Sequence, residues 1–268
     1  MFPIINIFGR EIGTYAVLAV IGLLLGGLYA CYAAKRRGLD TNDMILMQLF
    51  AGIGALIGSH LLYGITNIGF LVQLIQNADQ IPSFSHLLRS LGFIFGGGVF
   101  YGGLLGGLLA GMLTLKCKKL SIPDFADVIA PAIPLFHVFG RIGCFLGGCC
   151  YGVECSWGIT YTRALTPEAN GVPRFPVQLA ESAFNFLLFC LLAWLLHTGR
   201  FRRRLLPLYL CVYAVGRFCL EFFRGDAIRG SAAGLSTSQW ISLIVFAAGS
   251  VWLVWERMSN GATTSNND

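Results

Sequence analysis

Long apolar runs separated by short polar segments dominate the chain. Seven of these runs approach the ~20 residues that a helix needs to cross the hydrocarbon core of a bilayer. The runs lie at 12–34, 44–65, 91–115, 124–146, 178–198, 205–223 and 237–256. This pattern predicts an all-α membrane protein, built as a bundle of seven transmembrane helices.

Composition favours the same class of protein. Apolar residues make up 56% of the chain and charged residues 12%, whereas a soluble domain carries about a quarter charged residues. The opening MFPIINIFGREIG lacks the basic region and small-residue cleavage site of a secretory signal peptide, so we expect the first run to remain as a span. We predict one seven-span domain, 1–258, followed by a disordered polar tail, 259–268, on the cytoplasmic side.

Basic residues gather in alternate connections between the runs. KRRG (35–38), KCKK (116–119) and RFRRR (200–204) hold ten of the nineteen Lys and Arg residues. The positive-inside rule places these connections in the cytoplasm, with the N-terminus outside and the C-terminus inside. The basic runs are therefore interpreted as topology signals, and nucleic-acid binding as the poorer alternative.

The other connections are predicted to lie on the outer face. They are 66–90, 147–177 and 224–236. The first contains FLVQLIQNADQIPSFSHLLRSL (70–91), whose apolar spacing predicts an amphipathic helix in the membrane interface.

Charged residues within predicted spans are costly and by default indicate function. The residues concerned are Arg141, Arg217, Glu221 and Arg224. Glu221 follows Arg217 by four positions and Arg224 follows it by seven, so the three share a helical face. A structural Arg–Glu pair would account for one arginine of three. We favour arginines that converge on an anion, because the guanidinium fork suits phosphate.

Tyr101 is followed by two glycines, Gly102 and Gly103, which leave its phenol free to reach a ligand. A tyrosine that anchors the chain at the membrane interface is an equal alternative. The remaining glycines of 95–111 stand in small-xxx-small register, which predicts close packing between helices.

Other polar residues stand near the ends of spans. Gln178 and Glu181 are three apart and share a face near the start of the fifth run. Capping of that helix is the alternative for Glu181. His60 and His137 are interpreted as hydrogen-bonded histidines ahead of proton carriers.

Four cysteines follow Arg141 in the pattern C-x4-C-C-x4-C. They are Cys144, Cys149, Cys150 and Cys155. The pattern differs from the paired C-x2-C spacing of structural zinc sites, so we expect no metal. A disulfide that staples the outer loop is favoured, ahead of unpaired small residues, and redox chemistry or metal binding come after both. The other cysteines are interpreted as small apolar residues.

GRIGCFLGGCCYG (140–152) resembles the signature segment of bacterial phosphatidylglycerol–prolipoprotein diacylglyceryl transferases, which is close to G-R-x-G-N-F-x-N-x-E-x-x-G. Further segments resemble that family in order and spacing over nearly the whole chain. They are VFYGGLLGG (99–107), APAIPLFHVFGRIG (130–143), PRFPVQLAE (173–181), YAVGRFCLEFFRGD (213–226) and STSQWIS (236–242). The resemblance implies seven spans with the N-terminus outside.

The resemblance also implies a reaction. A diacylglyceryl group moves from phosphatidylglycerol to the lipobox cysteine thiol of a prolipoprotein, which forms a thioether and releases sn-glycerol 1-phosphate. The implied partners are phosphatidylglycerol, the prolipoprotein signal peptide and the lipid bilayer, without a cofactor. The implied location is the bacterial cytoplasmic membrane, with the active site on the outer side.

Two alternatives stay open. One is a diverged relative that moves a lipid group to another acceptor, with Cys144 or Cys149 as a relay nucleophile. The other is a non-catalytic membrane protein that binds phospholipid through the arginines.

The resemblance assigns catalytic positions to Arg141 and Arg217, as a phosphate clamp, and to Tyr15 and Tyr101. It assigns substrate-binding positions to Gly102, Gly103, Gly140, Gly143, Cys144, Cys149, Gln178, Glu181, Glu221, Arg224 and Gln239. No residue is assigned to a metal.

Within this set Glu221 would orient Arg217, and Arg224 would guard the outer opening. The chain departs from the family pattern where polar residues are usual. Cys144, Gly147 and Cys149 replace two asparagines and a glutamate, Phe175, Val177 and Ala180 replace a histidine, a serine and a tyrosine, and His60 replaces an arginine.

Overall fold

The computed structural model describes residues 1–77, 83–226 and 230–265, and it is mostly helical. Within that described part, six helical segments are long and apolar enough to cross a membrane. They are Thr14–Arg36, Thr41–Thr66, Phe100–Cys117, Ile122–Gly147, Val177–His197 and Thr237–Met258. The prediction of a multi-pass helical membrane protein is confirmed. The sixth predicted run forms α9 (Leu205–Glu221), which is 17 residues long, and the count of seven spans stays a prediction.

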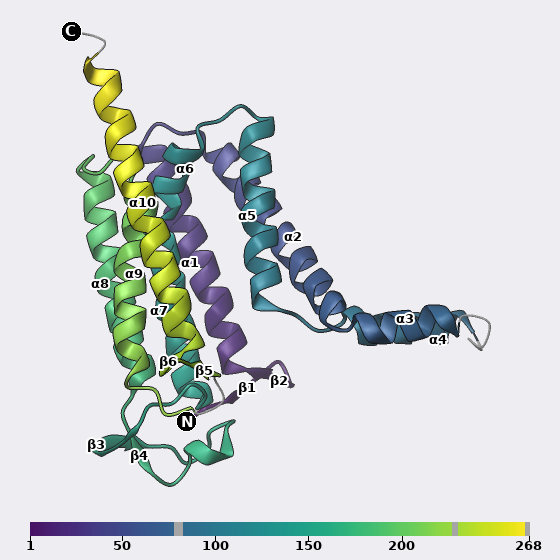
Figure 1. Cartoon of the computed structure of the whole chain (residues 1–268). Coiled ribbons are helices and arrows are strands. Elements are labelled where there is room, and N and C mark those ends of the chain that lie inside the picture. The colour runs from purple at the N-terminus through teal and green to yellow at the C-terminus, as the bar shows by residue number, and fades with distance from the viewer. Residues whose placement is uncertain (78–82, 227–229, 266–268) are drawn as a thin grey trace. The chain divides into compact units, whose positions relative to one another are not determined.

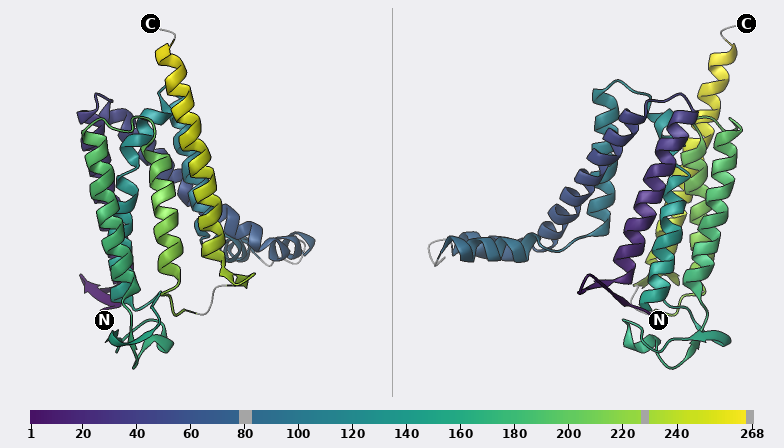
Figure 2. Two further views of the ribbon diagram at one scale, coloured as in Figure 1. Left: turned by 60° about the vertical axis from the view of Figure 1, so that its left-hand side comes forward. Right: turned by 180° about the vertical axis from the view of Figure 1, so that it is seen from behind.

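The chain divides into two compact units, Met1–Arg37 with Pro123–Asp268, and Gly38–Ile122. The first unit is a helical bundle in which neighbours pack in the order α1, α7, α8, α9 and α10 (Figures 1 and 2). Its helices are α1 (Thr14–Arg36), α6 (Ile122–Ile129), α7 (Ala132–Gly147), α8 (Val177–His197), α9 and α10 (Thr237–Ser265). The tail predicted from residue 259 begins within α10, and residues 266–268 lie outside the described part.

The fourth predicted run is two helices with a break between them. Helix α6 ends at Ile129, and α7 begins after Pro131. Proline has no backbone N–H and disfavours helical geometry in the residue before it, here Ala130. Helix α7 therefore begins as a separate helix, and Arg141 lies in its second half.

Short strands are a correction to the all-α prediction. They form three two-stranded antiparallel sheets: β1 (Ile4–Ile7) with β2 (Arg10–Gly13), β3 (Glu154–Thr160) with β4 (Pro173–Arg174), and β5 (Ser231–Ala232) with β6 (Leu235–Ser236). All three lie at one end of the first unit (Figure 1). Phe8 and Gly9, with φ of 52° and 80°, make the two-residue turn that a tight hairpin requires.

The second unit is built on α2 (Thr41–Thr66) and α5 (Phe100–Cys117), which pack along each other. A Cβ at Gly58 would lie 2.3 Å from the carbonyl oxygen of Gly102, and one at Gly106 would lie 2.2 Å from that of Gly54. Neither contact leaves room for a side chain. The predicted close packing through glycines is therefore confirmed.

The amphipathic helix predicted over 70–91 is two helices, α3 (Ile68–Gln76) and α4 (Phe84–Phe95), and residues 78–82 lie outside the described part. The third predicted run is likewise interrupted, between Phe95 and Phe100. His60 Nδ1 lies 2.8 Å from the carbonyl oxygen of Phe95 and 2.9 Å from that of Gly97. This confirms the interpretation of His60 as a hydrogen-bonded residue, and it holds the end of α4 against α2.

Candidate active site

Three arginines converge on one buried carboxylate in the first unit. Glu181, on the second turn of α8, is 3% exposed in its side chain, and its Oε2 lies 2.6 Å from Arg141 Nε. Its Oε1 lies 3.3 Å from a terminal nitrogen of Arg217 and 3.6 Å from one of Arg224. Glu181 forms ion pairs with three arginines, and among the described residues no side chain caps the start of α8, so the capping alternative for this residue is wrong.

Two further carboxylates complete this arginine–carboxylate cluster. Arg217 lies 2.5 Å from Glu221 Oε2 across one helical turn, as the spacing of four predicts. Arg224 binds Asp226 through two hydrogen bonds, of 2.9 and 2.8 Å. Three arginines and three carboxylates sum to zero formal charge (+3 − 3). The acids thus hold the guanidinium groups in place without leaving a net buried charge, whose cost would be large.

The start of α10 joins the same cluster. Ser236 Oγ donates to Glu221 Oε1 at 2.8 Å and accepts from the backbone N–H of Gln239 at 3.2 Å. Gln239 Oε1 accepts in return from the backbone N–H of Ser236 at 2.9 Å. This reciprocal pair is a capping box, so Gln239, predicted to bind substrate, is placed where it caps α10 and fixes a partner of Glu221.

The three arginines differ in exposure. The side chain of Arg141 is 23% exposed, that of Arg217 is 11% and that of Arg224 is 3%. A small pocket opens between the first two, and its lining residues are Arg141, Glu181, Phe184, Asn185, Tyr213, Arg217 and Leu220. Arg224, expected at an outer opening, is the most buried arginine of the cluster.

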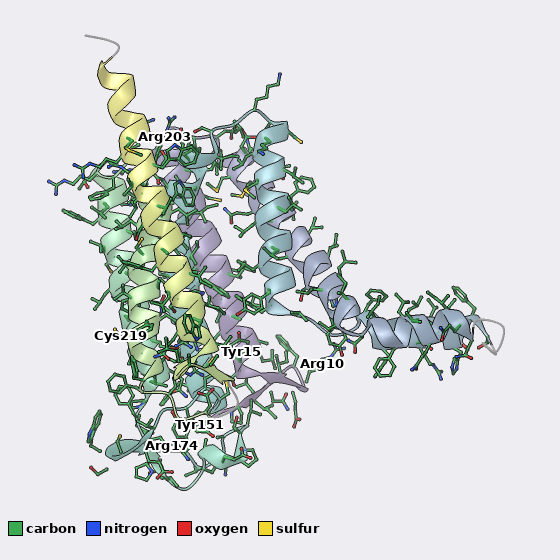
Figure 3. All side chains as sticks on the ribbon, viewed as in Figure 1. Arg10, Tyr15, Tyr151, Arg174, Arg203 and Cys219 are labelled. Atoms are coloured by element: carbon green, nitrogen blue, oxygen red, sulfur yellow. The ribbon has the colours of Figure 1, made fainter. Side chains whose placement is uncertain are left out.

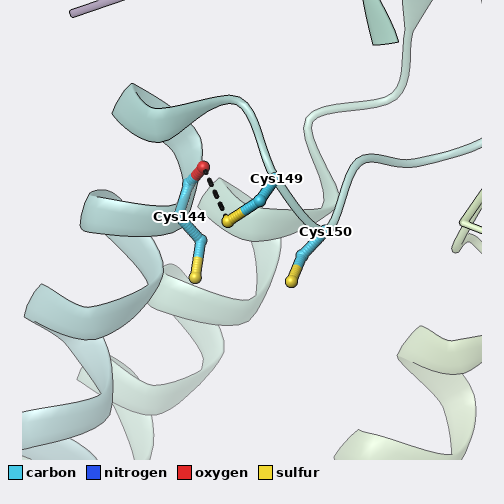
Figure 4. Close-up of side chains that lie close together, drawn as sticks. All are labelled: Cys144, Cys149 and Cys150. Carbon is cyan, nitrogen blue, oxygen red and sulfur yellow. Dashed lines mark hydrogen bonds between the residues drawn. The ribbon is translucent and has the colours of Figure 1, made fainter. Parts of the chain in front are cut away.

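Three of the cysteines form a second group. The sulfur atoms of Cys144, Cys149 and Cys150 all lie within 4.8 Å of one another, and Figure 4 shows their side chains grouped at the end of α7. All nine cysteines are free in the structure, so the predicted disulfide is not formed. The thiol of Cys149 donates to the carbonyl oxygen of Cys144 at 3.7 Å. The neighbouring thiols of Cys144 and Cys149, with the nearby guanidinium of Arg224, lower the pKa of Cys150 from its ordinary value.

A left-handed turn brings this group together. Gly148 ends α7 with φ of 72°, and a Cβ there would lie 2.3 Å from that of Ala164. The chain then reverses, so that the backbone N–H of Cys149 donates to the carbonyl oxygen of Cys144 at 3.1 Å. Cys150 also has a positive φ, of 58°, which is uncommon for a residue with a side chain. The surrounding contacts therefore fix the cysteine segment.

Gln178 is one of those contacts. It is fully buried, donates to the carbonyl oxygen of Cys149 at 2.8 Å and accepts from Tyr161 Oη at 3.1 Å. Backbone hydrogen bonds also join the cysteine segment to the segment of Arg224, from Val153 N to Phe223 O and from Gly225 N to Tyr151 O, both 3.0 Å. The two groups are thus held on one scaffold.

Sequence reasoning missed Arg174 and Tyr161. Arg174 is buried, donates to the carbonyl oxygen of Glu168 at 2.9 Å and lies over the ring of Tyr151 at 4.5 Å from its centroid (Figure 3). Arg174 could have been identified from its position, because it is a charged residue just before the start of a predicted span. Tyr161 lies in no apolar run or motif, and only its contact with Gln178 reveals it.

The comparison with known protein families identifies the family of the chain. The family model described as prolipoprotein diacylglyceryl transferase matches residues 3–255. The chain belongs to the prolipoprotein diacylglyceryl transferase family. It is thus a multi-pass membrane protein of an enzyme family, and the resemblance drawn from the sequence is confirmed.

Individual relatives agree over most of their length. A phosphatidylglycerol–prolipoprotein diacylglyceryl transferase of Clostridium tetani is 34% identical over 252 residues, which cover 93% of this chain and 95% of that protein. A second, of Clostridium perfringens, is 33% identical, with 91% of both chains covered. A third, of Geobacter sulfurreducens, is 33% identical, with 89% of this chain and 88% of that one covered.

The remaining residues that the family resemblance pointed to fall in both units. Tyr15 is half-exposed at the start of α1 (Figure 3), and a Cβ at Gly143 would lie 3.1 Å from its Cα. Gly140 has free space around it. Tyr101 is half-exposed on α5 in the second unit, where the adjoining glycines, Gly102 and Gly103, pack against α2.

Proposed function

We propose that this chain transfers the diacylglyceryl group of phosphatidylglycerol to the lipobox cysteine thiol of a prolipoprotein. The products are a thioether on the protein and sn-glycerol 1-phosphate. Family membership over residues 3–255 supports the reaction type. The convergence of Arg141, Arg217 and Arg224 on Glu181 is the structural observation that carries the proposal.

Arg141 and Arg217 bind the phosphate of the donor lipid. A guanidinium has five N–H donors, and one carboxylate engages at most two of them in a bidentate pair. Arg141 meets Glu181 through Nε and is the most exposed arginine of the cluster, so donors remain for a ligand. The small pocket that it lines with Arg217 has room for about one water molecule, so the lipid phosphate is placed at its mouth, beside the two guanidinium groups.

The same arginines serve the chemical step. When the acceptor thiolate attacks the glycerol carbon, the carbon–oxygen bond to phosphate breaks and negative charge grows on the leaving glycerol phosphate. Preorganised cations stabilise that charge without reorganising during the reaction. Glu181 and Glu221 supply this preorganisation, because each fixes Arg217 at salt-bridge distance.

The acceptor meets the donor near the cysteine group. Cys144 and Cys149 stand where the family usually keeps polar residues, and Gln178 holds their segment in place. Tyr15, which lies beside Gly143, supplies a phenol to this side. Roles for Tyr101, Gly102, Gly103 and Gly140 stay predictions from the family resemblance.

The proposed topology has seven spans in one membrane domain, the N-terminus outside and the C-terminus in the cytoplasm. The site then faces the outer side of the bacterial cytoplasmic membrane. In the first unit, the segment of Arg174 lies at the end of the bundle opposite Arg203, which belongs to a basic connection (Figure 3). That separation supports the orientation, because basic connections mark the cytoplasmic side.

Turnover by the purified chain tests the proposal. Phosphatidylglycerol micelles and a lipobox peptide are supplied, and released glycerol phosphate and lipidated peptide are measured by mass spectrometry. We expect Arg141→Ala to lower the rate by about 10²–10³-fold, the usual cost of losing one preorganised donor to a developing anion. Arg141→Lys keeps the charge without the fork and should fall between Ala and the parent.

The alternatives give different results. Lipid retained by the parent chain without any product would show a phospholipid-binding protein. A lipid adduct on Cys144 or Cys149 would show a relay to another acceptor. Equal rates for the parent and Arg141→Ala would contradict the phosphate clamp.

A further inference from the structure

The cysteine group has the chemistry of a metal site. Its members are thiols only, two of them half-buried and one buried, and their sulfur atoms share one space (Figure 4). Three thiols select thiophilic ions such as zinc over the oxygen-preferring magnesium and calcium. Cysteines that only filled separate packing positions would not be expected to bring their three sulfur atoms this close to one another.

The spacing suits such an ion after small side-chain adjustments. Zinc–sulfur bonds of ~2.3 Å place the sulfurs of one zinc ion roughly 4 Å apart, and the three sulfurs here already lie within 4.8 Å. The backbone that carries them is fixed by the turn at Gly148 and by the hydrogen bond from Gln178 to Cys149. Preorganised ligands of this kind lower the cost of binding.

We propose that Cys144, Cys149 and Cys150 bind one zinc ion through three thiolates and leave its fourth position to the thiol of the acceptor cysteine. This inference rests on the proposed function, since it assigns how that reaction activates its acceptor. Three ligands and one open position are the arrangement of catalytic zinc. A zinc-bound thiol loses its proton and becomes a nucleophile at neutral pH.

One guanidinium stands beside the cysteine group. Three thiolates and Zn²⁺ sum to −1, and a bound acceptor thiolate makes −2. The guanidinium of Arg224 lies near the thiol of Cys150 and 3.6 Å from Glu181 Oε1. Arg224 therefore connects the cysteine group to the arginine–carboxylate cluster.

The step balances as follows. The acceptor thiol gives one proton to solvent as its sulfur takes the fourth zinc position. That sulfur attacks the glycerol carbon, so a carbon–sulfur bond forms while the carbon–oxygen bond to phosphate breaks. The electron pair of the broken bond leaves on glycerol phosphate, held by Arg141 and Arg217. The thioether is a weaker ligand than a thiolate, and water displaces it from zinc.

Metal binding is tested on the full chain, purified in phosphatidylglycerol micelles with reductant. Zinc is counted by elemental analysis, and Co²⁺ is substituted to report thiolate ligands by its sulfur-to-cobalt charge-transfer absorption. We expect one metal per chain, and a change in the cobalt spectrum when a lipobox peptide is added. Cys144→Ser, Cys149→Ser and Cys150→Ser should each weaken zinc binding by at least about 100-fold, because second-shell changes alone cost 10–100-fold.

Cys155→Ser is the matched control, since Cys155 follows the same segment but is not one of the three clustered cysteines. It should keep the metal and the spectrum. Loss of metal in Cys155→Ser alone, absence of any bound metal, or a disulfide within the group under reductant would each overturn the inference. Removal of zinc by a chelator should also abolish turnover and its restoration should recover it.

A further variant separates this inference from the proposed function. Arg141→Ala loaded with cobalt should still show the spectral change with peptide while it releases little glycerol phosphate. Turnover by a metal-free parent chain would refute the zinc site and leave the proposed function standing. A peptide-responsive metal in a parent chain that never releases glycerol phosphate would refute the proposed function instead.

Discussion

The two units differ in the contacts that join their central helices. In the unit of α2 and α5, glycines bring backbones into direct contact, as at Gly58 and Gly102. In the other unit, α7, α8 and α9 are joined by buried charges, with Glu181 between Arg141 and Arg217. A membrane offers little hydrophobic gain for helix association, so each unit needs such a specific device.

Only one of these two kinds of contact can also bind a ligand. A glycine contact uses up its surface completely, since nothing fits between the two backbones. A guanidinium held by a carboxylate keeps further N–H donors, and in Arg141 part of the group stays exposed. The charged contacts therefore stabilise the bundle and also remain able to bind an anion, which the glycine contacts cannot do.

The largest expected effect comes from removing the shared carboxylate. Glu181→Gln keeps the volume but leaves three arginines facing each other with one acid fewer. Breaking a buried ion pair costs about 3–5 kcal/mol, so we expect that loss in the free energy of unfolding, measured by denaturant titration in mixed micelles. Turnover should fall with it. Glu154→Gln is the control, because this glutamate is 66% exposed in its side chain and lies 3.5 Å from Arg174. Its loss should change stability by less than about 1 kcal/mol.

Equal losses in the free energy of unfolding for the two glutamine variants would contradict the view that the arginine–carboxylate cluster is the main stabilising contact of its unit. A stable but inactive Glu181→Gln would sharpen the comparison further. It would show that the carboxylate positions the arginines for substrate more than it holds the helices.

A smaller effect is expected in the glycine-packed unit. Gly58→Val adds a Cβ that would lie only 2.3 Å from the carbonyl oxygen of Gly102. Overpacking typically costs about 1–3 kcal/mol, to be measured as a lower melting temperature of the purified chain. Gly52→Val on the same helix has nothing within 4 Å of its Cβ and serves as the matched control. Equal melting temperatures for the two variants would show that α2 and α5 do not depend on this contact.

Much of the fold followed from periodicity and length. Except for the third, which begins at Phe100 and not at 91, the long apolar runs predicted the helices to within a few residues, because helices in lipid must satisfy their own backbone groups. The breaks at Pro131 and at Gly96–Gly98 were not predicted, since each lies inside a single long run of mostly apolar residues. The short strands were not predicted either, because a hairpin such as Ile4–Gly13 cannot be told from the apolar run that follows it in the sequence.

The candidate site was predicted in part. Spacing alone gave the pairing of Arg217 with Glu221, because it is local to one helix. Spacing could not show that Glu181 bridges three arginines, that Asp226 holds Arg224, or that three cysteines share one space. Those contacts join residues from α7, α8 and the segments beyond them, and only the packed bundle brings them together.

The smallest expected effect lies where the charged cluster meets helix capping. Ser236→Ala removes the cap of α10 and the hydroxyl that donates to Glu221 Oε1. Loss of such a cap costs about 1 kcal/mol, while Ser236→Thr keeps the hydroxyl and should restore most of it. If the hydroxyl also orients Glu221, Ser236→Ala should lower turnover several-fold. Gln239→Ala removes only the other half of the capping box, so it should lower stability with little change in the rate of turnover. Equal loss of rate in both variants would mean that the start of α10, and not the hydroxyl, sets the position of Glu221. The charged unit would then depend on helix ends for its geometry as fully as the other unit depends on its glycines.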